Sequence, residues 1–192
     1  MPTPDPAALA FLLRRRSCPA KTLTLPVPDR AQLRPILTAA LRSPDHGKLE
    51  PWRLMVLERP ALQRLGRLAR ARAAELGHDP ERTDKGAGQF EQGNLAVAVI
   101  ACPRAHDKIP EIEQTYSAGA VCLALLNAAL ASGWGANWLS GWPSHDAPFA
   151  ARALGCAADE RIAGFIHIGT TTTTPPERPR PDLDRVVTWI SD

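Results

Sequence analysis

EQTYSAGAVCLALLNAALASG, residues 113–133, is the stretch that decides the fold of this chain. Small or apolar side chains occupy almost every position between Ala118 and Leu130, so a helix here would be apolar on nearly every face. A helix of that kind is buried on all sides. We therefore expect residues 113–132 to form a buried central helix. Part of its surface is expected at a subunit interface, because a chain of 192 residues has little else to cover it.

Shorter segments on either side of this helix predict the other elements. The predicted strands cover residues 52–57, 95–102, 136–140 and 161–168, and the predicted helices cover residues 6–15, 61–76 and 148–154. A further helix begins at the capping-box pair Asp29 and Gln32 and ends at Ser43-Pro44. Pro35 either kinks this helix or moves its start later, and the sequence leaves both open. The order of the elements indicates an α+β or three-layer α/β fold.

Three polar or extended segments complete the chain. Residues 79–94 contain Gly86, Gly88 and Gly93, and we expect a mobile loop that covers a ligand as a lid. Residues 103–110 form a second predicted loop. The tail over residues 170–181 is rich in Thr and Pro and should be extended, and residues 186–190 have strand character. That strand is expected to pair with a sheet edge, in the same subunit or a second one.

The composition is that of an ordinary globular protein with one domain over residues 1–192. Apolar residues make up 44% and charged residues 22%, and the net charge is only +3. This mild charge argues against a nucleic-acid surface. The longest apolar run, residues 118–131, is shorter than the roughly 20 residues of a membrane span, and no signal peptide is visible. We therefore expect a cytoplasmic protein that does not bind membranes.

Several kinds of chemistry lack their sequence patterns. The four cysteines show no CxxC spacing and are expected to be free thiols, and the five histidines lack metal-ligand spacing. Neither a P-loop, a GxSxG elbow nor a GxGxxG fingerprint occurs. The sequence therefore predicts no metal site and no nucleophilic side chain.

Two basic segments are candidates for holding an anionic ligand. Arg14-Arg15-Arg16-Ser17 follows the first predicted helix, and guanidinium forks suit a phosphate group. The alternative is favourable charge at a helix C-terminus. Residues 42–48, which include Arg42 and His46, follow the second helix and either form an ordinary turn or approach the polar edge of a flavin. Residues 138–142, with two tryptophans between glycines, either pack in the core or contact a flat ring system.

Six motifs in order resemble the nitroreductase family of FMN-dependent oxidoreductases, most closely its minimal single-domain bacterial branch. They are Arg15-Arg16-Ser17, Arg42-x-Pro44-Asp45-His46, Glu50-Pro51-Trp52, Glu113-Gln114-x-x-Ser117-Ala118-Gly119, Gly133-Trp134-Gly135 with Trp138-x-Ser140-Gly141, and Gly164-Phe165-x-x-x-Gly169. The resemblance covers nearly the whole chain. It implies a three-layer α/β/α homodimer with a mixed, mostly antiparallel sheet, and with two FMN sites at the interface built from both subunits.

The same resemblance implies roles for individual residues. Arg15, Arg16 and Ser17 hold the phosphate and ribityl end of FMN, and Arg42 and His46 approach the flavin. The site is completed by Trp138, Leu139 and Ser140, and NAD(P)H meets the end of the central helix at Ala128, Ala129, Leu130, Ala131, Ser132 and Gly133. The chain departs from the family pattern at Leu139 and Gly47, where basic residues are usual.

Three functions are weighed. The first is an FMN-dependent NAD(P)H oxidoreductase that reduces nitroaromatic or quinone acceptors by a ping-pong mechanism, with the flavin doing the chemistry and no side chain acting as a nucleophile. The second, motivated by Leu139, is a flavin-binding or sensor protein with little turnover. The third is a basic nucleic-acid module that uses Arg14–Arg16 and the arginines of residues 64–72.

Overall fold

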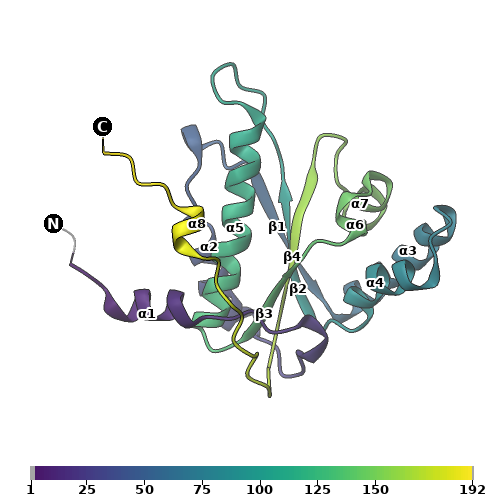
Figure 1. Cartoon of the computed structure of the whole chain (residues 1–192). Coiled ribbons are helices and arrows are strands. Elements are labelled where there is room, and N and C mark those ends of the chain that lie inside the picture. Colours follow the sequence, from purple (N-terminus) through teal and green to yellow (C-terminus); the bar gives the residue numbers. More distant parts are fainter. Residues whose placement is uncertain (1–2, 192) are drawn as a thin grey trace.

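A four-stranded antiparallel sheet forms the centre of the protein, as seen in a computed structural model that describes residues 3–191 (Figure 1). The strands are β1 (Trp52–Glu58), β2 (Leu95–Ala101), β3 (Gly135–Leu139) and β4 (Arg161–Gly169), in the order β1-β2-β4-β3. Each pairing between these strands is antiparallel, so the sheet is antiparallel rather than mixed as the resemblance implied. The four predicted strands are therefore confirmed, and so is the α+β class.

Helices cover both faces of the sheet and make three layers (Figure 1). One face carries α2 (Arg30–Ala40) and α5 (Glu111–Ala131), and the other carries α3 (Arg59–Glu75), α4 (Pro80–Glu91), α6 (Trp142–His145) and α7 (Ala147–Leu154). The remaining helices are α1 (Pro6–Arg14), α8 (Leu183–Val186) and the short 3-10 turns η1 (Ala20–Thr22) and η2 (His46–Lys48). In β2, Val97 and Val99 face α5 while Ala96 and Ala98 face α3. A strand buried on both faces is apolar throughout, which explains the unbroken apolar run of residues 95–102.

Local capping signals set the start of α2. Asp29 Oδ1 accepts the Gln32 N–H at 2.8 Å, and Gln32 Oε1 accepts the Asp29 N–H at 3.0 Å, so the predicted capping box is confirmed. The helix begins directly after Asp29 and continues through Pro35, so the alternative of a later start is excluded. Pro35 lacks the N–H that would bond to the carbonyl of Ala31, and the helix continues without that bond.

Residues 79–94 are mostly helical, and the prediction of a mobile loop there was wrong. Asp79 accepts the Arg82 N–H at 2.8 Å and Pro80 occupies the first turn of α4, so the helix has a proper start. Phe90 is fully buried against Phe149 and Phe165. Packing against the core therefore outweighs the low helix propensity of the glycines in this segment.

Gly86 and Gly88 give a matched pair of tests for this packing. A Cβ on Gly86 would lie 1.9 Å from Trp142 Nε1, whereas a Cβ on Gly88 would meet only Gln92 Nε2, at 3.7 Å. Alanine stabilises a helix by about 1 kcal/mol relative to glycine, but overpacking costs about 1–3 kcal/mol. In urea denaturation we expect Gly86→Ala to lower the free energy of unfolding by about 1 kcal/mol or more and Gly88→Ala to raise it. Equal gains in both variants would contradict this packing.

Two expectations about exposed surfaces are corrected. Residues 186–190 do not form a strand in this chain, because α8 ends at Val186 and the side chains of Trp189 and Ile190 are 86% and 79% exposed. The central helix is not buried on all sides, since Ile112, Tyr116 and Leu123 leave one stripe of α5 exposed. Both segments thus carry more apolar side chains than a single copy of the chain buries.

The central helix is also longer than its apolar run. With 21 residues, α5 is long and apolar enough to cross a membrane by length and composition alone. However, Val121, Leu125 and Ala129 are fully buried against the sheet. This packing makes α5 the core helix of the fold.

Candidate functional site

The segment Arg15-Arg16-Ser17 is held in place by β3. Arg15 leaves the helical conformation after α1, and the extended chain that follows runs to the start of β3. There, the Cys18 N–H donates to the Ala136 carbonyl at 2.9 Å, and Asn137 Nδ2 donates to the Cys18 carbonyl at 2.8 Å. These two bonds fix the direction in which the three polar side chains leave the backbone.

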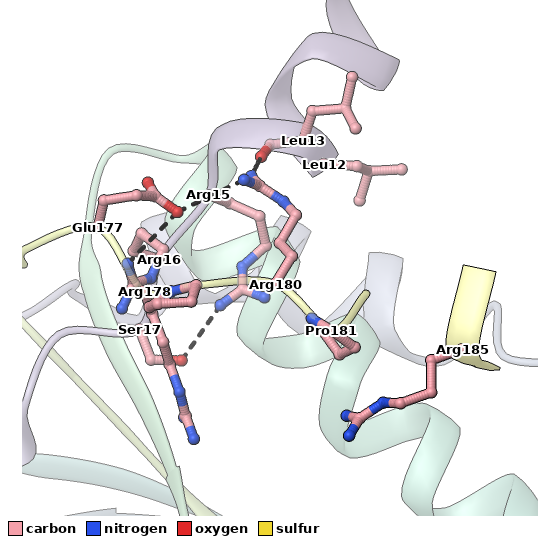
Figure 2. Close-up of a pocket in the computed structure, with 11 residues that line it drawn as sticks. Leu12, Leu13, Arg15, Arg16, Ser17, Glu177, Arg178, Arg180, Pro181 and Arg185 are labelled. Carbon is pink, nitrogen blue, oxygen red and sulfur yellow. Dashed lines mark hydrogen bonds and ion pairs between the residues drawn. The ribbon is translucent and has the colours of Figure 1, made fainter. Parts of the chain in front are cut away.

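A cavity of about 810 Å³ opens beside this segment, and the C-terminal tail forms its other wall (Figure 2). The cavity is lined by Leu12, Leu13, Arg15, Arg16, Ser17, Glu177, Arg178, Pro179, Arg180, Pro181 and Arg185. Five of these residues are arginines and one is a carboxylate. Glu177 lies 3.8 Å from Arg16 and 3.5 Å from Arg180, so one negative charge faces a large excess of positive charge.

Several guanidinium groups in this arginine pocket still lack an acceptor. Arg15 Nη2 donates to Ser17 Oγ at 3.2 Å, but Arg15 Nε is buried with no partner. Among residues 3–191, neither Arg178 nor Arg185 makes a side-chain hydrogen bond or an ion pair. A buried donor without a partner is costly, and a phosphate dianion offers oxygens that suit guanidinium forks. The pocket therefore fits a phosphate group.

The sequence analysis missed the three arginines from the tail. Arg178 and Arg180 lie in the segment 170–181, which we expected only to be extended over a surface, and Arg185 lies just beyond it in α8. Their spacing in the sequence carries a charge signal. However, Arg15 and Arg16, which form the other wall of the pocket, are about 165 residues away along the chain. Only the fold brings the two segments together.

Arg42 and His46 lie at the other end of α5. Arg42 borders a shallow cavity with Arg34 and Thr38 of α2, and His46 Nδ1 lies 2.7 Å from Glu113 Oε2 in the first turn of α5. Ser17, in contrast, lies near the segment that follows the last turn of α5. At 1.5 Å per residue the two ends of α5 are about 30 Å apart. One chain therefore does not bring Arg42 and His46 to its own Arg15.

Trp138 and Leu139 form the end of β3, and Ser140 directly follows the strand. Trp138 Nε1 donates to the Ala163 carbonyl at 3.2 Å, and a Cβ on Gly164 would lie 2.0 Å from that nitrogen. The indole thus lies across the glycine of β4. Ser140 is four positions beyond Ala136, which corresponds to about 13 Å of extended chain. These residues extend the site away from Ser17.

Two more polar atoms without partners lie next to this segment. Gln89 Oε1 of α4 and Ser144 Oγ of α6 are buried with no hydrogen bond. The Ser144 N–H donates to the Gly141 carbonyl at 2.9 Å, and a Cβ on Gly141 would lie 3.3 Å from Gln89 Nε2. Sequence reasoning did not identify Gln89 or Ser144, because nothing in their local sequence distinguishes them from surface residues.

Only part of the segment predicted to contact NAD(P)H, residues 128–133 at the end of α5, is exposed. Ala129 is fully buried in the core, whereas Ala131, Ser132 and Gly133 are exposed. Gly133 has φ +84°, which ends the helix and turns the chain toward β3. The exposed turn therefore lies beside the strand that holds Ser17.

The arginines on α3 are largely neutralised within the chain. Arg70 pairs with Glu91 and Asp84, and Arg72 pairs with Asp146 and Glu75. Hydrogen bonds from Arg152 and Arg72 lower the pKa of Glu75 to about 2. Arg64 Nη2 donates to the Ala153 carbonyl at 3.0 Å, which leaves Arg67 as the member of this row without a partner among residues 3–191. This face does not present the free positive charge that a nucleic-acid surface needs.

Comparisons with known proteins agree with this architecture. The model of the nitroreductase family matches residues 12–170. A protein named "Putative NAD(P)H nitroreductase YdjA" from Escherichia coli (strain K12) is 35% identical over 163 residues, which cover 85% of this chain and 87% of that protein.

Two solved structures share the fold. A nitroreductase-like family protein from Bacillus cereus superposes with a TM-score of 0.79 at 22% identity and covers all of both chains. An FMN-dependent nitroreductase from Clostridium difficile has a TM-score of 0.69 at 19% identity, with 95% of this chain and 99% of that chain covered. With the matched family model and the relative in E. coli, these findings show that the chain belongs to the nitroreductase family.

Proposed function

We propose that this oxidoreductase binds FMN in the arginine pocket and uses NAD(P)H to reduce nitroaromatic or quinone acceptors. The observation that carries the proposal is the excess of guanidinium donors around Arg15, whose buried Nε has no acceptor. The related C. difficile protein is described as FMN-dependent, and FMN ends in a phosphate group that can accept hydrogen bonds from these donors. The E. coli relative is described as an NAD(P)H nitroreductase. We further propose that residues 1–192 act as one domain in the cytoplasm.

In the proposed complex, each group of residues contacts a different part of FMN. Arg15, Arg16 and Ser17 bind the phosphate end together with the arginines of the tail. Trp138, Leu139 and Ser140 would contact the ring. When bound, the flavin accepts a hydride from NAD(P)H and passes electrons to the acceptor. The side chains bind the cofactor, orient it and exclude water.

We propose that the second half of the site comes from another copy of the chain. Besides the exposed stripe of α5, several large apolar side chains at both ends of the chain are exposed, namely Leu9, Leu12 and Leu13 of α1 and Leu183, Val186, Trp189 and Ile190 near the C-terminus. Exposed apolar surface on this scale supports an interaction surface. In a two-fold homodimer, Arg42 and His46 of one copy can face the arginine pocket of the other.

In this proposal NAD(P)H and the acceptor bind in turn at the same face of the flavin. Of the predicted NAD(P)H segment, the exposed residues Ala131, Ser132 and Gly133 are available for contact. Alternation of donor and acceptor gives ping-pong kinetics.

The absorbance spectrum of the purified protein tests the proposal. We expect flavin bands that are present on purification or appear on addition of FMN, that bleach with NADH or NADPH under anaerobic conditions, and that recover with nitrofurazone or menadione. A spectrum that shows no flavin bands, even with added FMN, would contradict the proposal.

The same experiment separates a second candidate, a flavin-binding protein with little turnover. This candidate is favoured by Leu139, which places a half-buried apolar side chain where a basic one is usual. Flavin that binds but bleaches no faster than free FMN would support this function.

A further inference from the structure

Side chains in the first turns of α5 form hydrogen bonds to two loops, and the proposed function does not explain these bonds. Glu113, Gln114 and Ser117 belong to a motif identified in the sequence, and each of their side chains reaches out of the helix to a loop. Gln114 accepts the Arg104 N–H at 2.8 Å and donates to the Arg104 carbonyl at 2.9 Å, which fixes residues 103–110. The other two side chains bind the loop over residues 44–50.

The 44–50 loop has an unusual backbone. Gly47, Lys48 and Glu50 have φ values of +72°, +53° and +47°. Non-glycine residues in this region are strained and persist only where surrounding contacts impose the conformation, and such strained residues cluster at functional sites. The loop is therefore kept in one conformation by specific partners.

Those partners are visible in the hydrogen bonds of the loop. Asp45 accepts the N–H groups of Leu49 and Glu50, each at 2.9 Å. Ser117 Oγ donates to the Pro44 carbonyl at 2.8 Å and accepts from Trp52 Nε1 at 3.0 Å. Both ends of the loop are thus fixed, and His46 lies between them.

The contact between Glu113 and His46 determines how the imidazole is presented. A carboxylate only accepts hydrogen bonds, so His46 Nδ1 carries the proton in the 2.7 Å contact with Glu113 Oε2. The hydrogen bond at one ring nitrogen sets the role of the other. Nε2 is on the opposite side of the ring and makes no hydrogen bond within residues 3–191. His46 therefore presents Nε2 away from α5.

We propose that Glu113 is a positioning residue for the reaction, which fixes the ring of His46 so that Nε2 faces the cofactor bound by the partner subunit. This inference rests on the proposed function and deepens it. At metal sites, where a carboxylate orients a ligating histidine in the same way, removing the carboxylate costs about 10–100-fold in affinity or activity, and we take the lower end of that range for His46. Glu113 would act only through His46, which makes the role separable from a purely structural one.

A double-mutant cycle tests this role. We expect Glu113→Ala to lower kcat by about tenfold with a smaller change in KM. In a His46→Ala background the same substitution should have no further effect, because the side chain that it positions is gone. Glu111→Ala is the matched control. It removes a carboxylate from the same turn of α5, and this carboxylate binds no side chain in the described part of the chain.

A second readout does not depend on activity. In the ¹⁵N spectrum of the cofactor-free protein, the ring nitrogens of His46 should show protonated Nδ1 in the wild type and in Glu111→Ala, and a mixture of tautomers in Glu113→Ala. Urea denaturation of each variant checks that it folds. The inference would be overturned by unchanged ring signals in Glu113→Ala, or by a full loss of kcat when Glu113→Ala is added to His46→Ala. If the wild type binds flavin, the proposed function remains intact in either case. A wild type that binds no FMN would overturn both.

Discussion

Replacing Arg15 with alanine is expected to weaken FMN binding by about a hundredfold or more. Hydrogen bonds to charged groups contribute about 1.5–3 kcal/mol each, and the half-buried Arg15 lines the pocket with its buried Nε unpaired. Loss of two such bonds to the phosphate corresponds to at least two factors of ten in Kd. Fluorescence titration of FMN with cofactor-free protein measures the effect. Arg15→Lys keeps the charge but loses the fork, so its affinity should be intermediate.

Arg67→Ala provides the charge-matched control for this experiment. Arg67 lies on the exposed face of α3, away from the pocket, and removing it changes the net charge of the protein by the same amount. Affinity for FMN should be unchanged. If Arg15→Ala and Arg67→Ala weakened binding equally, the pocket would contribute no more than general electrostatic attraction, and the phosphate assignment would be wrong.

Mixed dimers extend this test to the proposed sharing of the site. One chain carries Arg15→Ala, and the other carries Arg42→Ala with His46→Ala. In a shared site, the heterodimer combines all the substitutions in one site and leaves the second site intact. It should therefore regain one FMN site per dimer that both parent homodimers lack. A site built within one chain would leave both sites of the heterodimer defective.

The second large effect is a loss of stability in mild acid caused by His167. Its ring is fully buried on β4 and neither nitrogen has a hydrogen-bond partner. Burial lowers the pKa of His167 from 6.5 to about 4. Between these values the unfolded chain binds a proton that the folded chain does not, so the free energy of unfolding falls as the pH falls. A shift of this size corresponds to about 3 kcal/mol.

His167→Leu isolates this contribution. The substitution removes the titrating ring and its two unpaired nitrogens, so the variant should be at least as stable as the wild type at pH 7 and should lose less stability between pH 6.5 and 4. Urea denaturation across this range gives the difference. His145→Gln, at an exposed position, should behave as the wild type. Parallel curves for the wild type and His167→Leu would show that His167 does not titrate as a buried group.

Carboxylates lose their stabilising effect mainly at lower pH than His167 does. Hydrogen bonds from Arg53 lower the pKa of Glu160 to about 2, and those from Arg152 and Arg72 do the same for Glu75. Stability from a depressed carboxylate is present above its unfolded pKa, near 4.5, and is lost as the pH falls toward 2. The effect of His167 therefore precedes theirs on acidification.

The sequence predicted the elements whose signals are local. The capping box of Asp29 and Gln32, the continuous apolar run of β2 and the glycine stop after Leu154 each depend on a few neighbouring residues. The start of α4 was also encoded, by Asp79 and Pro80, but the glycines that follow suggested a loop. Contacts of Phe90 with aromatic residues of α7 and β4 decided that segment, and such contacts have no local signature.

The sequence by itself determined the strands, most of the helices, the family motifs and the basic residues at the end of α1. Only the tertiary structure decided that Arg178, Arg180 and Arg185 join Arg15 in one pocket, and that His46 meets Glu113 at the far end of α5. The reason is physical. Helix caps and hydrophobic periodicity act over a few residues, whereas a charge pocket depends on how segments more than 150 residues apart are placed when the core closes.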